Sequence, residues 1–266
     1  DWSSDVCSSD LRALVTGSTQ GLGLAVARRL ASAGCDVVLH GLGDASDIEA
    51  HRRQIETEHG VRCIYSGADL KNASAIEEMV ELATSTFDGI DILINNAVVR
   101  HVAAVESMVP DHWNEDLAVN LSAAFHTIRL TLPGMKTRNW GRIVNVSSIY
   151  GLVGATNRVG YVTTKTALLG LTRAVALETT EYNITCNAIC PGTSATPVHE
   201  ESLARLRESK VLDREAAERT LLAGKQPTGR LVATDGVAAL VALLCSPESR
   251  DITGAAIPID GGWSAM

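Results

Sequence analysis

The chain has 266 residues, of which 45% are hydrophobic and 20% are charged, and 31 acidic against 23 basic residues give it a formal net charge of -8. This length and apolar content suit one large α/β domain with a sizeable core. The acidic balance argues against nucleic acid or an anionic membrane as the main partner, and no apolar run reaches the roughly 18 residues that a membrane-spanning helix needs.

Short apolar runs alternate with longer helical patterns along most of the chain. The runs that we expect to form strands are 13–15, 36–39, 61–65, 91–94, 141–146, 184–189 and 256–259. The stretches that we expect to form helices are 22–33, 48–59, 73–87, 112–132, 161–180, 199–223 and 235–244. Strands that alternate with helices in this way predict right-handed βαβ units. The expected fold is a single-domain, doubly wound Rossmann fold with a parallel seven-stranded sheet.

Residues 1–11 do not follow this pattern. They contain four serines and no strand pattern, and they resemble the in-frame translation of a common sequencing-adapter oligonucleotide. We therefore expect residues 1–11 to be non-native and the folded domain to occupy residues 12–266. Resequencing of the locus tests this expectation.

Six cysteines are scattered along the chain, and no pair of them has the CxxC spacing of a redox or metal motif. Cys186 and Cys190 lie near the end of an expected strand, and no histidine cluster accompanies them. We interpret the cysteines as buried thiols in a reducing cytosol. The sequence thus predicts a cytoplasmic protein without a metal site.

A glycine-rich turn follows the first expected strand. It reads TGSTQGLG over residues 16–23, with glycines at positions 17, 21 and 23. Glycines permit a tight turn and a close approach of the backbone to a pyrophosphate, and the next helix directs unpaired amides and its positive dipole end at that anion. The pattern indicates a dinucleotide site, with a plain βα turn as the alternative.

Tyr161 and Lys165 stand four residues apart on one expected helix, so they share a face of it. A free tyrosine has a pKa of about 10, and a neighbouring ammonium stabilises its phenolate and lowers that pKa. Ser148, just after the fifth expected strand, can hold a substrate oxygen. The pair alone is common on protein surfaces, but behind a strand-end serine in this fold it predicts a proton-transferring site.

These features together resemble the short-chain dehydrogenase/reductase family. The resemblance runs from Arg12 to the DGGW sequence at 260–263. It is carried by TGSTQGLG at 16–23, NNA at 95–97, Asn120, Ser148, YVTTK at 161–165 and CPG at 190–192.

The family resemblance implies a nicotinamide-dependent oxidoreductase with a catalytic tetrad of Asn120, Ser148, Tyr161 and Lys165. Tyr161 would be the general acid/base, Ser148 would orient the substrate oxygen, and Lys165 would also bind the nicotinamide ribose. Asn120 would hold a water that links Lys165 to solvent. The same resemblance implies a homotetramer and a lid at about 193–229.

The residues that the resemblance assigns to the cofactor follow the expected strands. They are Gly17, Thr19, Gly21, Leu22, Gly23, Asp69, Leu70, Asn96, Ala97, Tyr161, Lys165, Pro191 and Gly192. Val98 stands where the family usually has Gly, and Ser194 stands where it often has an apolar residue. NAD is expected rather than NADP, because Gln20 precedes Gly21 and no Arg or Lys occurs between residues 36 and 51.

Several stretches resemble the D-3-hydroxybutyrate dehydrogenase branch of this family: HGLGD at 40–44, GADL at 67–70, NLSA at 120–123, GLV at 151–153, NAICPG at 187–192 and KQP at 225–227. The branch grips a carboxylate with Gln, His, Lys and Gln, and the matching positions here hold Arg100, Tyr150, Arg158 and Ser202. Two arginines can bind a carboxylate bidentately. The alternative is that both are solvated surface residues.

The substrate expected from the sequence is a small molecule, a 3-hydroxy acid such as 3-hydroxybutyrate. The alternatives are a related reductase of a sugar, polyol or other ketone, and a non-catalytic NAD-binding protein. His101, beside Arg100, is expected to be a loop residue rather than a catalyst.

Overall fold

Within residues 11–266, which this computed structural model describes, seven strands form one parallel sheet in the order β3-β2-β1-β4-β5-β6-β7. The expectation for residues 1–10 lies outside the described residues. The strands are β1 (Arg12–Val15), β2 (Asp36–His40), β3 (Cys63–Ser66), β4 (Ile92–Asn95), β5 (Gly141–Val146), β6 (Ile184–Pro191) and β7 (Ala256–Ile259). The doubly wound fold with a seven-stranded parallel sheet is confirmed.

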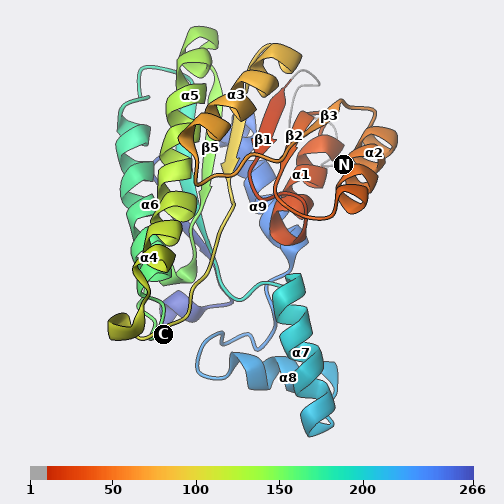
Figure 1. The fold of residues 1–266 in the computed structure, drawn as a ribbon, viewed down its shortest axis with the longest axis vertical. Helices are drawn as coiled ribbons and strands as arrows, with labels where there is room; N and C mark the ends of the chain where they lie inside the picture. The colour runs from red at the N-terminus through yellow and green to blue at the C-terminus, as the bar shows by residue number, and fades with distance from the viewer. Residues whose placement is uncertain (1–10) are drawn as a thin grey trace.

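Helices cover both faces of the sheet (Figure 1). They are α1 (Gly21–Ser32), α2 (Ala45–His59), α3 (Ala73–Phe87), α4 (Pro110–Leu117), α5 (Ala123–Arg138), α6 (Val159–Leu177), α7 (Pro197–Lys210), α8 (Arg214–Leu222) and α9 (Thr234–Cys245). Alternate residues of a strand serve the two layers: Ala13 and Val15 join the core under α1 and α9, and Leu14 joins the core under α3 and α5. Burial on both faces explains why the strands are continuous apolar runs.

The order in which the strands are added to the sheet changes side between β1 and β4. These two strands are neighbours, with Val15 opposite Ile94, while β2 and β3 lie on one side of them and β5 to β7 on the other. In open parallel sheets, ligands bind at the carboxyl ends of the strands at such a switch point. The loops that carry the predicted site residues therefore meet there.

The helix expected over residues 112–132 is divided in the structure. α4 ends at Leu117, a π-helical turn spans Ala118–Ser122, and α5 continues to Arg138. A π turn adds a residue to the helical turn, and such turns occur often at functional sites. Asn120 lies within this π turn. Pro133, where we expected the helix to stop, is accommodated inside α5.

The lid region also differs from the single helical stretch expected at 199–223. It forms two helices, because Val211 adopts a left-handed conformation (φ 51) that ends α7, and Asp213 then caps α8. An ion pair of 2.7 Å between Arg214 and Glu200 joins the two helices. Figure 1 shows α7 and α8 projecting from the end of the sheet rather than covering it.

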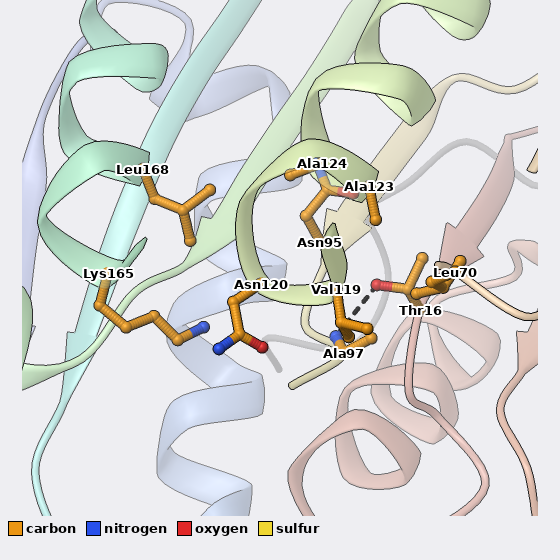
Figure 2. A pocket seen from close by; sticks show the side chains of 10 residues that line it. All are labelled: Thr16, Leu70, Asn95, Ala97, Val119, Asn120, Ala123, Ala124, Lys165 and Leu168. Carbon is orange, nitrogen blue, oxygen red and sulfur yellow. Dashed lines mark hydrogen bonds between the residues drawn. The ribbon is translucent and has the colours of Figure 1, made fainter. Parts of the chain in front are cut away.

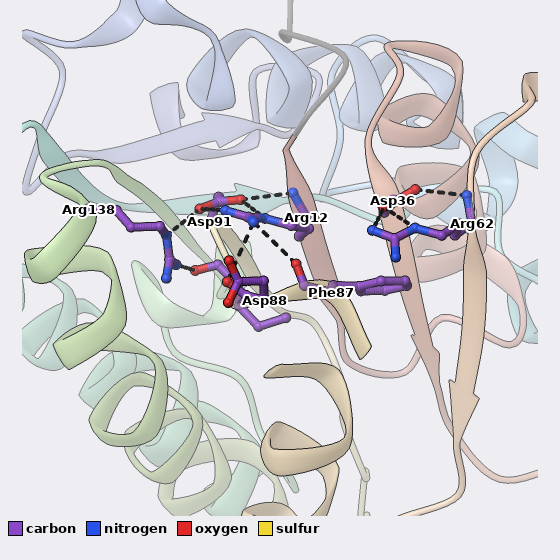
Figure 3. A network of polar contacts seen from close by, with 8 residues as sticks. Arg12, Asp36, Arg62, Phe87, Asp88, Asp91 and Arg138 are labelled. Carbon is purple, nitrogen blue, oxygen red and sulfur yellow. Dashed lines mark hydrogen bonds and ion pairs between the residues drawn. The ribbon is translucent and has the colours of Figure 1, made fainter. Parts of the chain in front are cut away.

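At the opposite end of the strands, a network of polar contacts ties three elements together (Figure 3). The buried carboxylate of Asp91, just before β4, accepts hydrogen bonds from Arg12 of β1 and from Arg138 of α5. Charge-assisted bonds of this kind are stronger than neutral ones. The network fixes β1 against β4, the two strands that flank the switch point. Within residues 11–266, no helix is long and apolar enough to cross a membrane.

Candidate active site

A cleft of about 450 Å³ opens at the carboxyl ends of the strands. Its size lies within the range of ligand sites. The structure brings most of the predicted cofactor and catalytic residues to its walls: Gly17, Thr19, Gly21, Leu22, Gly23, Asp69, Leu70, Asn96, Ala97, Ser148, Tyr161, Lys165, Pro191 and Gly192. Arg100 and Val98 also line it.

The glycine-rich turn at residues 16–23 leaves no room for a side chain at Gly17 or at Gly23. Gly17 has a positive φ of 64, and a Cβ on it would lie 2.8 Å from the Cα of Ala97. A Cβ on Gly23 would lie 2.1 Å from the carbonyl oxygen of Gly17. Gln20 precedes α1 without a side-chain cap, so the amides of the first helical turn keep no side-chain partner there. This cradle fits a pyrophosphate.

Two side chains hold the loops of this cleft together. Asn96, after β4, donates from its amide to the carbonyl oxygens of Thr16 and Gly17, at 2.9 Å each. His40, at the end of β2, accepts at Nδ1 from the Gly17 amide (3.0 Å), and its Nε2 lies 3.0 Å from the Ala68 carbonyl oxygen. In the sequence, His40 stood out only as part of HGLGD at 40–44, although its position at a strand end was a signal for a role between loops.

The end of the cleft nearest β2 carries no cationic side chain from that strand or its loop. Burial lowers the pKa of His40, and its two ring contacts require the neutral ring. Leu42 lines the cleft and is 69% exposed. Asp44 does not line it, because its carboxylate caps α2 by accepting from the amides of Ser46 and Asp47.

Tyr161, Lys165 and Ser148 meet in the middle of the cleft, and all three are buried. The Lys165 ammonium lies 5.8 Å from the centre of the Tyr161 ring and donates to the carbonyl oxygen of Val146 at 2.7 Å. Ser148 Oγ accepts from the Tyr150 amide at 3.2 Å, which leaves its hydroxyl hydrogen free to donate. The three side chains therefore lie together in one cleft.

The electrostatics of this group favour an ionised phenol. Burial alone raises the pKa of Tyr161, but the charges of Lys165 and Arg100, with hydrogen bonds from Ser148 and Arg100, outweigh it and place that pKa below its usual value. Burial lowers the pKa of Lys165, while the neighbouring Tyr161 opposes that change. A buried phenol whose pKa is displaced in this way is suited to proton transfer.

Asn120 lies on the far side of Lys165, facing a cavity of about 10 Å³ (Figure 2). Figure 2 shows the Asn120 amide and the Lys165 ammonium turned toward each other. The Asn120 side chain is also a clamp, since its oxygen accepts from the Val99 amide at 2.8 Å and its nitrogen donates to the Val99 carbonyl oxygen at 3.0 Å. The clamp fixes the loop after β4 against the π turn.

Of the predicted substrate residues, Arg100 and Tyr150 lie against Tyr161. Arg100 lies over Tyr161, with its guanidinium carbon 5.5 Å from the ring centre. Tyr150 packs edge-on against Tyr161 and Trp263, at 6.3 and 5.4 Å between ring centres. Arg158 lies close enough to lower the pKa of Tyr150, although burial keeps that pKa raised. Trp263 was not singled out from the sequence.

Two of the positions singled out in the sequence lie elsewhere. The Ser202 hydroxyl is exposed on α7 and donates to the carbonyl oxygen of Val198 in its own helix, at 2.9 Å. Ser202 therefore does not reach the cleft. Ser194 is buried, and its hydroxyl donates to the Gly192 carbonyl oxygen at 3.2 Å. Neither residue is among those that line the cleft.

His199 of α7 lies near three cationic side chains. Burial lowers the pKa of His199, and the charges of Arg100, Lys225 and Arg158 lower it further. Sequence reasoning missed both His199 and Lys225 as site residues, because they come from α7 and from the turn after α8. His101 pairs with Glu115 at 2.9 Å and stacks on His112, as expected for a loop residue outside the cleft.

The cysteines carry no chemistry in this cleft. The five described ones are buried, and Cys7 lies outside the described residues. Burial raises the pKa of Cys63 and of Cys186 to about 12, so both are neutral thiols near pH 7. Among residues 11–266, no group of three or more His, Cys, Asp or Glu side chains could hold a metal ion.

A doubly wound sheet, a glycine-lined cleft at its switch point and a buried tyrosine–lysine–serine group define an oxidoreductase of the nicotinamide-dependent class. The family model described as short chain dehydrogenase matches residues 12–206. The chain therefore belongs to the short-chain dehydrogenase family.

Relatives with known names support this membership over nearly the whole chain. The chain is 44% identical to a D-beta-hydroxybutyrate dehydrogenase of Cupriavidus necator over 96% of its length and 98% of that protein. It is 38% identical to the corresponding dehydrogenase of Rhizobium meliloti, again over 96% and 98%. Among solved structures, L-sorbose reductase from Gluconobacter frateurii, complexed with NADPH and L-sorbose, has a TM-score of 0.91 and 27% identity, covering 97% of this chain and 98% of that one.

Proposed function

We propose that this chain is an NAD-dependent dehydrogenase that interconverts a short 3-hydroxy acid, such as D-3-hydroxybutyrate, and the matching 3-keto acid. The observation that carries the substrate class is the set of three cations, Arg100, Arg158 and Lys225, whose charges act together on His199 of α7. Of the three, Arg100 also lies over the Tyr161 ring. None of the ion pairs within residues 11–266 involves these three side chains. A substrate carboxylate would supply the missing counter-charge. The named relatives act on such an acid.

The choice of NAD rests on the end of β2. A cofactor with a 2′-phosphate requires a cation close to that point. His40 is neutral, Leu42 is apolar, and Asp44 is occupied as a helix cap. Thr19, Gly41 and Leu42 would hold the adenosine ribose, and the amides of residues 21–23 would hold the pyrophosphate.

In the proposed reaction, a bound nicotinamide ring would supply the hydride acceptor, and the protein would handle the proton. The Ser148 hydroxyl would donate to the substrate oxygen and orient it. The Tyr161 phenolate would accept the proton of the substrate hydroxyl as the carbonyl forms. Lys165 would stabilise that phenolate and bind the nicotinamide ribose. All three groups are within the same cleft.

We also propose that the small cavity between Lys165 and Asn120 carries protons away from Tyr161. At about 10 Å³ it is close to the size of one water molecule. The Lys165 ammonium and the Asn120 amide would provide its polar walls. The Asn120 side chain is already hydrogen-bonded to the backbone of Val99. In this role Asn120 would therefore act through its place in the π turn as well as through its side chain.

For assembly we propose a homotetramer built through the layer of α5 and α6. Phe125 of α5 is 48% exposed and Leu177 of α6 is 74% exposed, so this layer presents apolar surface that an association would cover. Light scattering of the intact protein tests this proposal: a mass of four chains supports it, and a monomer contradicts it. The cytoplasmic location stays a prediction.

A second candidate, a reductase of a sugar or polyol ketone, is favoured by one observation. The structural match to L-sorbose reductase is close over nearly the full chain. That candidate does not explain why three cations act together on His199, since a neutral sugar needs none. We therefore place it second.

The test is a substrate panel of D-3-hydroxybutyrate, its L enantiomer and polyols, each with NAD and NADP, followed by the absorbance of the reduced cofactor. We expect turnover with D-3-hydroxybutyrate and NAD. Arg158→Gln should raise KM for the acid by about tenfold or more, because a charge-assisted contact is lost. The control is Arg173→Gln, which removes an exposed arginine from the same helix. Efficient turnover of polyols alone would contradict the proposal.

A further inference from the structure

Arg100 occupies an unexpected place, because it faces Tyr161 as well as the mouth of the cleft. Its guanidinium carbon lies 5.5 Å from the centre of the Tyr161 ring, and its charge lowers the pKa of the phenol. The Lys165 ammonium lies at a similar distance of 5.8 Å from that centre. Two cations from different elements therefore act on one buried phenol, one from α6 and one from the loop after β4.

The loop that carries Arg100 is fixed on both sides. Val99 is held through both of its backbone groups by Asn120, at 2.8 and 3.0 Å. On the other side, the Ala103 amide donates to the carbonyl oxygen of Asn157 at 3.2 Å, and Ala103 forms a bridge with Arg158. Arg100 thus projects from a backbone that is tied to the π turn and to the start of α6, the helix that carries Tyr161.

The other groups around Tyr161 come from four elements. Lys165 belongs to α6, Ser148 follows β5, and Tyr150 packs edge-on at 6.3 Å. His199 of α7 lies beside Arg100, and Cys190 of β6 lies near Lys165. The leading causes of the Tyr161 pKa shift include no carboxylate. Within residues 11–266 Arg100 takes part in no ion pair, although Glu115 lines the same cleft.

We propose that Arg100 is a positioning residue for Tyr161: with Lys165 it forms a two-cation clamp that favours the phenolate and fixes its oxygen toward the substrate. The proposal rests on the proton-transfer role proposed for Tyr161. A guanidinium is suited to this position because it stays charged at every working pH and presents a flat, rigid set of donors. Because an opposite charge at such distances lowers a pKa by about 1 to 3 units, the second cation extends oxidation to lower pH.

The direct test is a titration of tyrosinate by near-ultraviolet absorbance on the intact protein without substrate. The Tyr161 signal is the difference between each variant and the same variant carrying Tyr161→Phe. We expect Arg100→Gln to raise the Tyr161 pKa by about 1 unit or more, and Arg100→Lys to restore most of the difference. The matched control is Arg158→Gln, which removes a cation that acts on Tyr150 and is not among the leading causes of the Tyr161 pKa shift. An unchanged pKa in Arg100→Gln would overturn the inference.

The kinetic test uses D-3-hydroxybutyrate and NAD. In Arg100→Gln the acid limb of the kcat/KM profile should move to higher pH by the same amount as the Tyr161 pKa in the titration. At a pH well below that pKa, kcat/KM should then fall roughly tenfold for each unit by which the Tyr161 pKa rises. If Arg100 only binds the substrate, KM will rise while the acid limb stays in place, and the inference is overturned while the proposed function stands. Full turnover in Tyr161→Phe, in contrast, would overturn the proposed function itself.

Discussion

Lys165 Nζ donates a hydrogen bond of 2.7 Å to the main-chain carbonyl oxygen of Val146, the last residue of β5. The next residue, Ser147, donates from its hydroxyl to the Lys165 carbonyl oxygen at the same distance. The end of β5 and the second turn of α6 are therefore joined twice. These bonds hold the ammonium below Tyr161 rather than leaving it free in the cleft, and they give a fixed charge to the proton-transferring group.

Replacement of this ammonium should damage both chemistry and cofactor binding. We expect Lys165→Met to lower kcat at neutral pH by roughly 100-fold or more, because the Tyr161 phenolate loses its nearest cation. KM for NAD should rise as well, since the proposed ribose contact is lost. Steady-state kinetics across a range of pH give both values. Lys136→Met, a half-buried lysine of α5 that lies over the Tyr182 ring, serves as the control. Near-normal kcat in Lys165→Met would refute this role.

Cofactor preference should be reversible at one position. Leu42 lines the cleft at the end of β2, and neither that strand nor its loop supplies a cation for a 2′-phosphate. We expect Leu42→Arg to raise kcat/KM for NADP by about tenfold or more, because a charge-assisted contact to phosphate becomes possible. Leu82→Arg, an exposed leucine of α3, controls for added charge. If the unmodified protein already prefers NADP, the assignment of NAD is wrong.

The buried carboxyl of Asp116 should lower the free energy of unfolding at neutral pH. Its side chain is fully buried against Gly160, and one carboxylate oxygen has no hydrogen-bond partner among the described residues. Burial raises the pKa of Asp116. A carboxyl whose pKa is higher in the folded state destabilises the protein once the pH exceeds its unfolded value, and the loss is complete above its folded value.

We therefore expect Asp116→Asn to raise the free energy of unfolding at neutral pH by about 1 kcal/mol, since the amide carries no charge to desolvate. The gain should shrink as the pH falls toward about 4, where the wild-type carboxyl is protonated. Urea unfolding at several pH values measures this difference, with the exposed Asp251→Asn as the control. A loss of stability at neutral pH would show that Asp116 has a stabilising partner.

Much of the fold and the centre of the site could be predicted from local sequence. Buried parallel strands are continuous apolar runs, and their carboxyl ends meet at one edge. The side chains that follow them, such as Asn96 and Ser148, could therefore be placed together. The spacing of Tyr161 and Lys165 fixes them on one helix face without any tertiary information.

The remaining features depend on contacts that no local pattern records. The π turn at Asn120 interrupts a stretch that contains no glycine or proline. The Asn120 side chain is bound to the backbone of Val99, a contact with a distant loop. The lid breaks at Val211, a β-branched residue that rarely adopts a left-handed conformation. The meeting of Arg100 with Tyr161 joins a loop to a helix far along the chain. Residue type alone gave Arg100 a role toward substrate only.

The most direct measurement of the proposed chemistry compares Tyr161→Phe with the unmodified protein. NADH formation from D-3-hydroxybutyrate and NAD is followed beside NADH binding by fluorescence, with Tyr182→Phe as the control because that tyrosine lies outside the cleft. We predict that Tyr161→Phe abolishes turnover and leaves NADH affinity nearly unchanged, while Tyr182→Phe behaves as the unmodified protein. Turnover that survives in Tyr161→Phe would contradict a mechanism centred on this phenol.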